Sequence, residues 1–168
     1  MKIELKKIEY NERMSEETLC FVADLYINGK KVGYCKNDGR GGPNAYYGNS
    51  REDNQVIQNA EAYFKSLPKV KPDGYNFEYQ PTLESAIDDC FELWLKKREE
   101  KRMRKVMEMA IIWGKPNGNS YTLIKEKRKL SEIPTNVLQS KVDRIKAKHC
   151  TNGVVILNTN LTQLGINI

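Results

Sequence analysis

The chain has 168 residues, of which 39% are hydrophobic and 30% charged, so it has enough apolar material to build a folded core. No apolar run approaches the length of about 18 residues that a membrane span needs. The charged segment after Met1 is unlike a signal peptide, and we therefore expect a cytoplasmic protein without membrane contact. A single histidine, His149, excludes any mechanism that needs two imidazoles.

The first forty residues predict an antiparallel three-stranded meander. Residues 2–10 alternate apolar and charged side chains, and residues 18–28 are rich in β-branched and aromatic types, as strands are. Asn28-Gly29 predicts a tight hairpin turn, because a type I′ turn needs positive φ at both central positions. Residues 30–36 then return as the third strand.

Three helices follow from apolar spacing. Ser50 is a good N-cap for a helix over 51–66, and Thr82 for one over 83–108, while 134–148 forms the third. Residues 103–110 fit either the end of the second helix or the start of a strand. Residues 109–113 and 120–125 predict a hairpin, and 154–157 a short strand. The order predicts an α+β fold in one domain, 1–168, with an acidic half at 1–80 and a basic half at 81–168.

The net charge of +6 conceals an uneven distribution. Residues 1–93 carry 12 basic and 16 acidic side chains, a net of −4, whereas residues 94–168 carry 16 basic and 6 acidic, a net of +10. Such asymmetry is typical of chains that bind nucleic acid or another polyanion. A solvated lysine-rich surface that binds nothing is the alternative.

The candidate binding residues are basic side chains in three segments of the second half. On a helix, positions 97, 101, 104 and 105 share one side, and such a ridge can follow a phosphate backbone and release its counterions. The candidates are Lys96, Lys97, Arg98, Lys101, Arg102, Arg104, Lys105, Lys127, Arg128, Lys129, Lys141, Arg144 and Lys148.

A glycine-rich loop followed by two tyrosines is a second candidate site. Consecutive glycines in Asn37-Asp-Gly-Arg-Gly-Gly42 allow backbone N–H groups to point at an anion, with Arg40 adding charge beside Asp38. Tyr46 and Tyr47 could stack on a base or contact a protein partner. The alternative is a wide structural turn, with both tyrosines covering the sheet.

Chemistry that needs a metal or a nucleophile has little support in the sequence. The four cysteines, Cys20, Cys35, Cys90 and Cys150, lack the close pairing of zinc sites, so free thiols are expected. Asp73 is not followed by the Glu-x-Lys that metal-dependent nucleases use. We therefore expect no cofactor, no metal and no catalytic residue, with a small metal-dependent enzyme as the weakest hypothesis.

One stretch carries a family resemblance. Ser15-Glu-Glu-Thr-x-Cys-Phe-x-Ala-Asp-Leu-Tyr-Ile-Asn-Gly-Lys-x-x-Gly33 and the Asn37–Gly42 segment resemble a group of small, uncharacterised phage and prophage proteins, over about the first fifty residues. The ending Val155-Ile-Leu-Asn158 is also similar. The resemblance implies an accessory protein of phage origin, of a kind that often disables host machinery, including defence nucleases, but assigns no functional residue.

Composition and resemblance together predict a non-enzymatic protein that binds nucleic acid, with RNA favoured, or a host nucleoprotein defence complex in the manner of an anti-CRISPR inhibitor. The basic second half would carry the contact. A protein-interaction module that uses the loop at 37–48 is the alternative. The sequence leaves the oligomeric state open.

Overall fold

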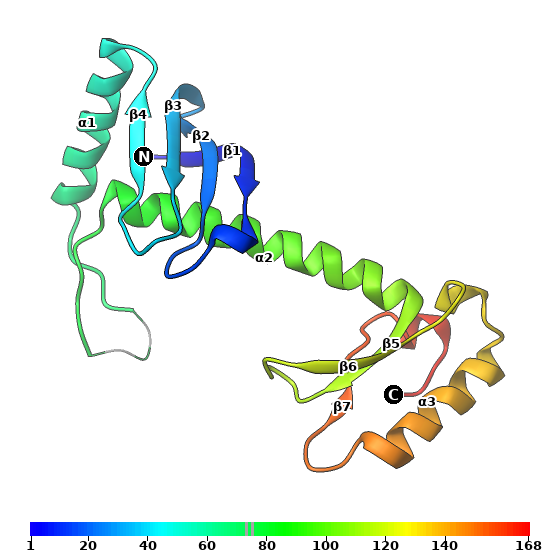
Figure 1. Ribbon diagram of the computed structural model, residues 1–168. Coiled ribbons are helices and arrows are strands. Elements are labelled where there is room, and N and C mark those ends of the chain that lie inside the picture. The colour runs from blue at the N-terminus through cyan, green and yellow to red at the C-terminus, as the bar shows by residue number, and fades with distance from the viewer. Residues whose placement is uncertain (73, 75) are drawn as a thin grey trace. The chain divides into compact units, whose positions relative to one another are not determined.

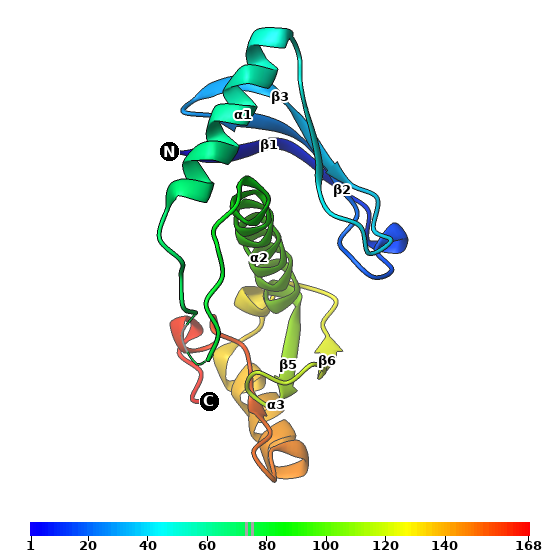
Figure 2. The same cartoon turned by 90° about the vertical axis from the view of Figure 1, so that its left-hand side faces the viewer.

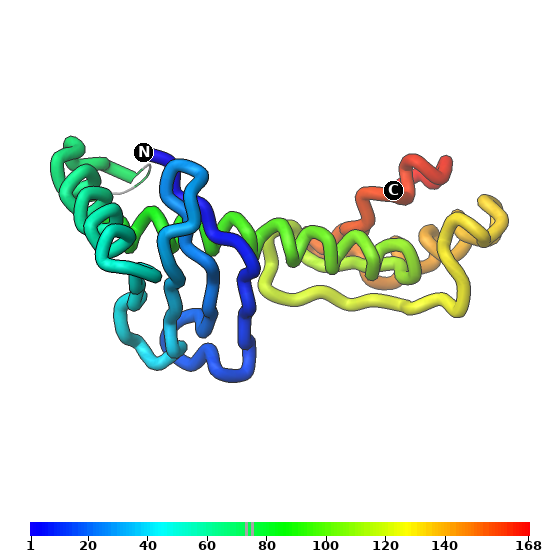
Figure 3. Tube along the Cα trace, turned by 90° about the horizontal axis from the view of Figure 1, so that it is seen from above, coloured from blue at the N-terminus to red at the C-terminus, as the bar shows by residue number. Residues whose placement is uncertain are grey.

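A computed structural model describes residues 1–72, 74 and 76–168, and these form two compact units, Met1–Leu95 and Lys96–Ile168. Each unit has its own hydrophobic core. The sequence suggested a single domain whose halves meet near residue 80. The boundary between the two compact units falls at Leu95, inside α2 (Leu83–Met109), which Figures 1 and 3 trace as one uninterrupted helix. The fold is α+β, as predicted.

The first unit contains a four-stranded antiparallel meander in the order β1-β2-β3-β4. Its strands are β1 (Ile3–Tyr10), β2 (Phe21–Ile27), β3 (Lys30–Asn37) and β4 (Ala45–Gly48), and a short 3-10 turn, Glu12–Met14, lies between β1 and β2. At the turn between β2 and β3, Asn28 and Gly29 have φ values of 50° and 83°, which confirms the predicted turn geometry.

The prediction of three strands is corrected to four, because Ala45–Gly48 pairs with β3 and is not part of a loop. Glycines make this pairing possible. Gly33 lies opposite Gly48, and a Cβ on Gly33 would stand 1.8 Å from the carbonyl oxygen of Tyr47. A short segment bounded by glycine has a weak strand signature, so its place in the sheet depends on this close approach.

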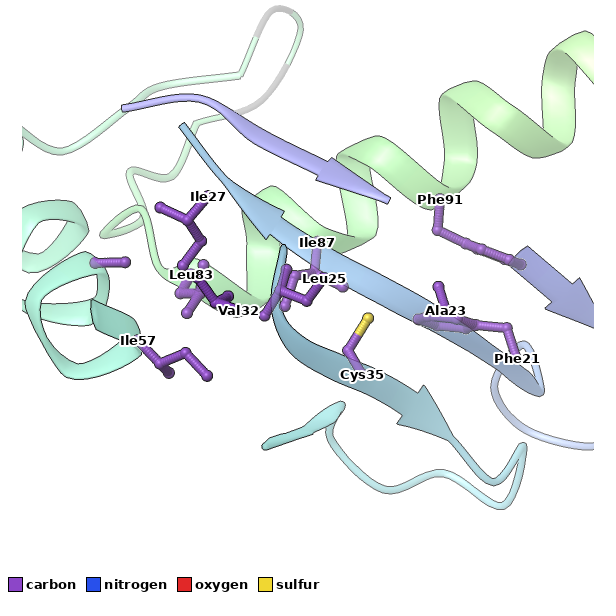
Figure 4. Close-up of a cluster of buried hydrophobic side chains, with 11 residues drawn as sticks. Phe21, Ala23, Leu25, Ile27, Val32, Cys35, Ile57, Leu83, Ile87 and Phe91 are labelled. Atoms are coloured by element: carbon purple, nitrogen blue, oxygen red, sulfur yellow. The ribbon is translucent and has the colours of Figure 1, made fainter. Parts of the chain in front are cut away.

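Two helices cover one face of the meander. α1 (Arg51–Ser66) begins as predicted, with the Ser50 hydroxyl accepting a hydrogen bond from the Asp53 N–H at 3.1 Å. Figure 2 shows α1 and the first part of α2 on the same side of the curved sheet. Leu83 and Ile87 of α2 are fully buried against the inward side chains of β2 and β3, as Figure 4 shows.

The second unit is built around a buried strand. The end of α2 passes directly into β5 (Ala110–Gly114), which answers the question that the sequence left open at 103–110. β5 lies between β6 (Tyr121–Lys125) and β7 (Val155–Ile156), antiparallel to both. α3 (Thr135–His149) lies between two 3-10 turns, Leu130–Glu132 and Thr162–Leu164.

β5 separates two apolar layers, because its side chains alternate between its faces. Ile111 and Trp113 pack with α3, and the opposite face places Ala110 and Ile112 against Met107 of α2. Every residue of β5 is buried, whereas every residue of the edge strand β6 is exposed. The exposed strand borders the candidate site.

Candidate functional site

A groove of about 600 Å³ lies between the second half of α2 and the strand β6, within the second unit. Its floor is apolar and its rim is cationic. The floor is formed by Val106, Met109, Ala110 and Leu123, and the rim by Arg98, Lys101, Arg102, Lys105 and Lys125.

Helical and strand periodicity explain why these residues meet. Each α2 residue that lines the groove has another groove residue three or four positions away, so these residues share one face of the helix. On β6, Leu123 and Lys125 are two residues apart and lie opposite Ile112 and Ala110, the β5 residues that face α2. Both β6 side chains are therefore directed to the α2 side of the sheet.

The groove carries a strong positive charge. The second unit has 16 basic and 6 acidic residues, which gives it a net charge of +10. The boundary between the acidic and basic parts of the sequence therefore coincides with the boundary between the two units. Over the part of the chain that the structure describes, Lys101, Lys105 and Lys125 form no ion pair. Arg102 contacts Glu99 at 3.5 Å, but both side chains are exposed, so this pair holds the arginine weakly.

The predicted ridge and the groove occupy faces of α2 that overlap only in part. Lys101 and Lys105 line the groove as part of it, but Lys96, Lys97 and Arg104 are exposed on other parts of the helix surface. The segment 96–102 contains no apolar residue that would fix the helix face from sequence. Two of the four residues of the predicted ridge at 97, 101, 104 and 105 therefore line the groove, and they supply two of its five cations.

The other predicted cations are distributed over two places. Lys127 and Arg128 are exposed in the connection that follows β6, and Lys129 pairs with Glu108 at 3.5 Å. On α3, Lys141 is half-buried and pairs with Glu126 at 2.5 Å, a contact that supports the fold. Arg144 and Lys148 are exposed on α3.

Sequence reasoning missed the parts of the groove that are not helical cations. Lys125 is the last residue of the predicted strand 120–125. Its spacing of two residues from Leu123 could have indicated that both side chains lie on one face of that strand. Val106 and Met109 are apolar residues in the segment 103–110, and both are half-buried. Leu123 is 39% exposed, which no local pattern indicates.

The loop 37–44 is held by hydrogen bonds within the first unit. The Asn37 side-chain oxygen accepts hydrogen bonds from the Thr18 hydroxyl and the Gly39 N–H at 2.7 and 2.8 Å, and its amide donates to the Gly42 carbonyl. The Gly41 N–H donates to the Thr18 hydroxyl. Gly39 and Gly41 have φ values near 84°, and a Cβ on either would collide with the segment 14–17. The glycines thus permit the conformation of the turn. The N–H groups of Gly39 and Gly41, which were expected to bind an anion, instead donate hydrogen bonds within the protein.

The other residues of this candidate site lie in the loop and in β4, and several of them contact neighbouring side chains. Asp38 pairs with Lys36 at 3.4 Å, and Arg40 is exposed. The Tyr46 hydroxyl donates to Glu61 at 2.6 Å, and burial together with this carboxylate raises the pKa of Tyr46. Tyr47 is exposed and lies against Tyr34 on the outer face of the sheet, with ring centroids 5.3 Å apart.

A smaller hollow of about 260 Å³ in the first unit has an acidic lining from Glu84, Asp88 and Glu92. Burial raises the pKa of Asp88, although the Asn44 amide that donates to its carboxylate at 2.6 Å acts in the opposite direction. Within the described ranges, no group of three or more His, Cys, Asp or Glu residues is placed to hold a metal. Asp73, the residue that was compared with the motif of metal-dependent nucleases, lies outside those ranges.

The four cysteines are free thiols, as predicted. Cys35 belongs to the core of the first unit, and its burial raises the pKa of the thiol to about 12. A thiol with so high a pKa is a weak nucleophile at neutral pH.

Comparison with protein-family models, with curated proteins and with solved structures gives no match for this chain. Among the described helices, none combines the length and the apolar character that crossing a membrane requires.

Proposed function

We propose that the second unit binds nucleic acid, with RNA as the favoured ligand, and that the groove between α2 and β6 is the contact surface. The observation that carries the proposal is the convergence of five cationic side chains on one groove, three of which have no ion-pair partner among the described residues. Unpaired lysines on a surface with an excess of +10 attract a polyanion and release its counterions.

The charge distribution also favours nucleic acid over a small anion. Five cationic side chains line the groove, and Lys127 and Arg128 are exposed two and three residues beyond Lys125, so the cations outnumber those that one phosphate can contact. A phosphate backbone carries a charge at every nucleotide and can follow such a surface. By the same reasoning, the RNA of a nucleoprotein defence complex is a possible target, and the phage-type resemblance of the first unit fits that context.

Charge reversal in the groove tests the proposal. We expect the triple variant K101E/K105E/K125E to lose affinity for a fluorescein-labelled 12-nucleotide RNA by tenfold or more, at about 100 mM salt. The slope of log K against log salt concentration should fall in magnitude by about 2, since each lost phosphate contact removes about 0.7 to 0.9. Fluorescence polarisation over a series of salt concentrations measures both quantities.

A matched control separates the groove from net charge. The variant K65E/K69E/K71E makes the same change in charge on exposed residues of the first unit and should keep most of the affinity. The variant K97E/R104E, on the part of α2 outside the groove, should weaken binding less than the groove variant does. Failure of the wild-type protein to bind RNA or DNA at low salt, or equal loss in the two triple variants, would refute the proposal.

A further inference from the structure

The floor of the groove exposes apolar surface where a soluble sheet edge would be expected to carry charge. β6 is an edge strand, and three of its five residues, Tyr121, Leu123 and Ile124, are large hydrophobic side chains that are 39–46% exposed. Exposed apolar edges invite aggregation, and proteins usually protect them. On the α2 side of β6, Leu123 lies in the groove together with the cations of the rim, and the mutual repulsion of these cations opposes the docking of a second copy of the chain.

A ligand that fills this groove needs two chemical properties at once. It must carry negative charge to meet the rim, and it must present an apolar surface to Val106, Met109 and Leu123. The cavity, at about 600 Å³, falls within the range of about 300–1,000 Å³ that is typical of sites for small molecules, and so has room for a nucleoside-sized group.

Single-stranded nucleic acid has both properties, and a duplex has only one of them. In a duplex the flat faces of the bases are stacked on one another, and the protein meets mainly phosphates and sugars. In a single strand the base faces are free to stack on aromatic, apolar or guanidinium groups, as they do in other proteins that bind single strands. Arg98 and Arg102 offer guanidinium planes at the rim, and a methionine sulfur such as that of Met109 makes favourable contacts with aromatic rings.

We infer that the groove receives an unpaired nucleobase on its apolar floor while the rim lysines hold the adjoining phosphates, so that the second unit selects single-stranded RNA over duplex RNA. This inference rests on the proposed function, because it names the form of nucleic acid that the same groove takes. Tyr121 extends the stacking surface, since it lies on the same face of β6 as Leu123 and is 46% exposed.

The test uses a pair of neighbouring residues on β6. Leu123 and Ile124 are 39% and 43% exposed, but they point to opposite faces of the sheet, and only Leu123 lines the groove. We expect L123S to weaken binding of a 12-nucleotide single-stranded RNA about fivefold to tenfold, which is the low end of what a lost base contact costs. I124S should change that affinity less than twofold, and both variants should keep their affinity for a 12-base-pair RNA duplex.

Three probes distinguish the possible outcomes. The wild-type protein should bind the single strand at least fivefold more tightly than the duplex, and also more tightly than an abasic deoxyribose-phosphate strand of equal length. Equal binding of all three, with no difference between L123S and I124S, would overturn the inference while leaving the proposed function intact. Absence of binding to any of them would refute the proposed function itself. Tighter, Leu123-dependent binding of an acidic peptide that contains leucine and phenylalanine would overturn the inference in favour of a protein ligand.

Discussion

At the scale of single residues, the buried side chain of Asn158 connects the C-terminal segment to β5 in the second unit. It is 1% exposed, its side-chain oxygen accepts a hydrogen bond from the Ile112 N–H at 2.6 Å, and its amide donates to the Ala110 carbonyl at 2.9 Å. It therefore satisfies two buried backbone groups of β5 beyond the point where β7 ends. The ending Val155–Asn158, noted in the sequence only as part of a resemblance, thus has a structural role through its last residue.

Removal of this amide should destabilise the second unit. We expect N158A to lower the free energy of unfolding by about 2–5 kcal/mol, because it leaves two buried backbone groups without partners at about 1–3 kcal/mol each. Chemical denaturation followed by circular dichroism measures the change. N167A, at an exposed asparagine, is the control and should be within about 0.5 kcal/mol of wild type. A loss below about 1 kcal/mol for N158A would contradict this role.

At the scale of secondary structure, the sequence predicted the elements well where local signals are strong. Helix α1 has the predicted bounds, and the hairpin at Asn28-Gly29 has the predicted conformation. β4 was missed because a run of only four residues after a glycine-rich loop is too short to show an alternating pattern, although Tyr46 and Tyr47 favour strands, and its pairing with β3 defines it. The face of α2 that borders the groove differs from the face of the predicted ridge, because packing of α2 against β5 sets which side of the helix faces the sheet.

The pairing of β4 should fail when its close approach to Gly33 is blocked. We expect G33A to cost about 1–3 kcal/mol of stability, because the new methyl group meets the carbonyl of Tyr47 and the strands must separate. G42A adds a methyl group where nothing lies within 4 Å and should be neutral. Denaturation curves of the two variants measure the difference, and equal stability of G33A and G42A would show that β4 tolerates the displacement.

At the scale of the whole molecule, the chain separates both its cores and its charge. The core of the first unit and the two apolar layers of the second share no residue, and the net charge of −4 in Met1–Leu95 stands against +10 in Lys96–Ile168. This coincidence suggests that the two units carry different tasks. The second unit has the cationic groove that we propose as the surface for a polyanion.

Separate cores predict separate responses to damage. We expect G33A to raise amide hydrogen exchange in β3 and β4 but not in β5, and N158A to raise it in β5 but not in β2 or β3. The double variant should lose the sum of the two single free-energy changes to within about 0.5 kcal/mol, because the sites share no contacts. Exchange monitored by mass spectrometry gives the local response. A rise in exchange throughout both units in either single variant would show that the units unfold as one.

The sequence by itself determined the α+β class, most element positions and the charge partition. These depend on residue spacing, turn chemistry and composition, which act over a few neighbours along the chain. The division into two units, the strand β4, the role of Asn158 and the groove were decided by tertiary structure. Lys105 and Lys125 are separated by twenty positions and meet on one groove only because β5 folds β6 back beside α2. Pairing and packing between distant segments decide such contacts, and local patterns do not encode them.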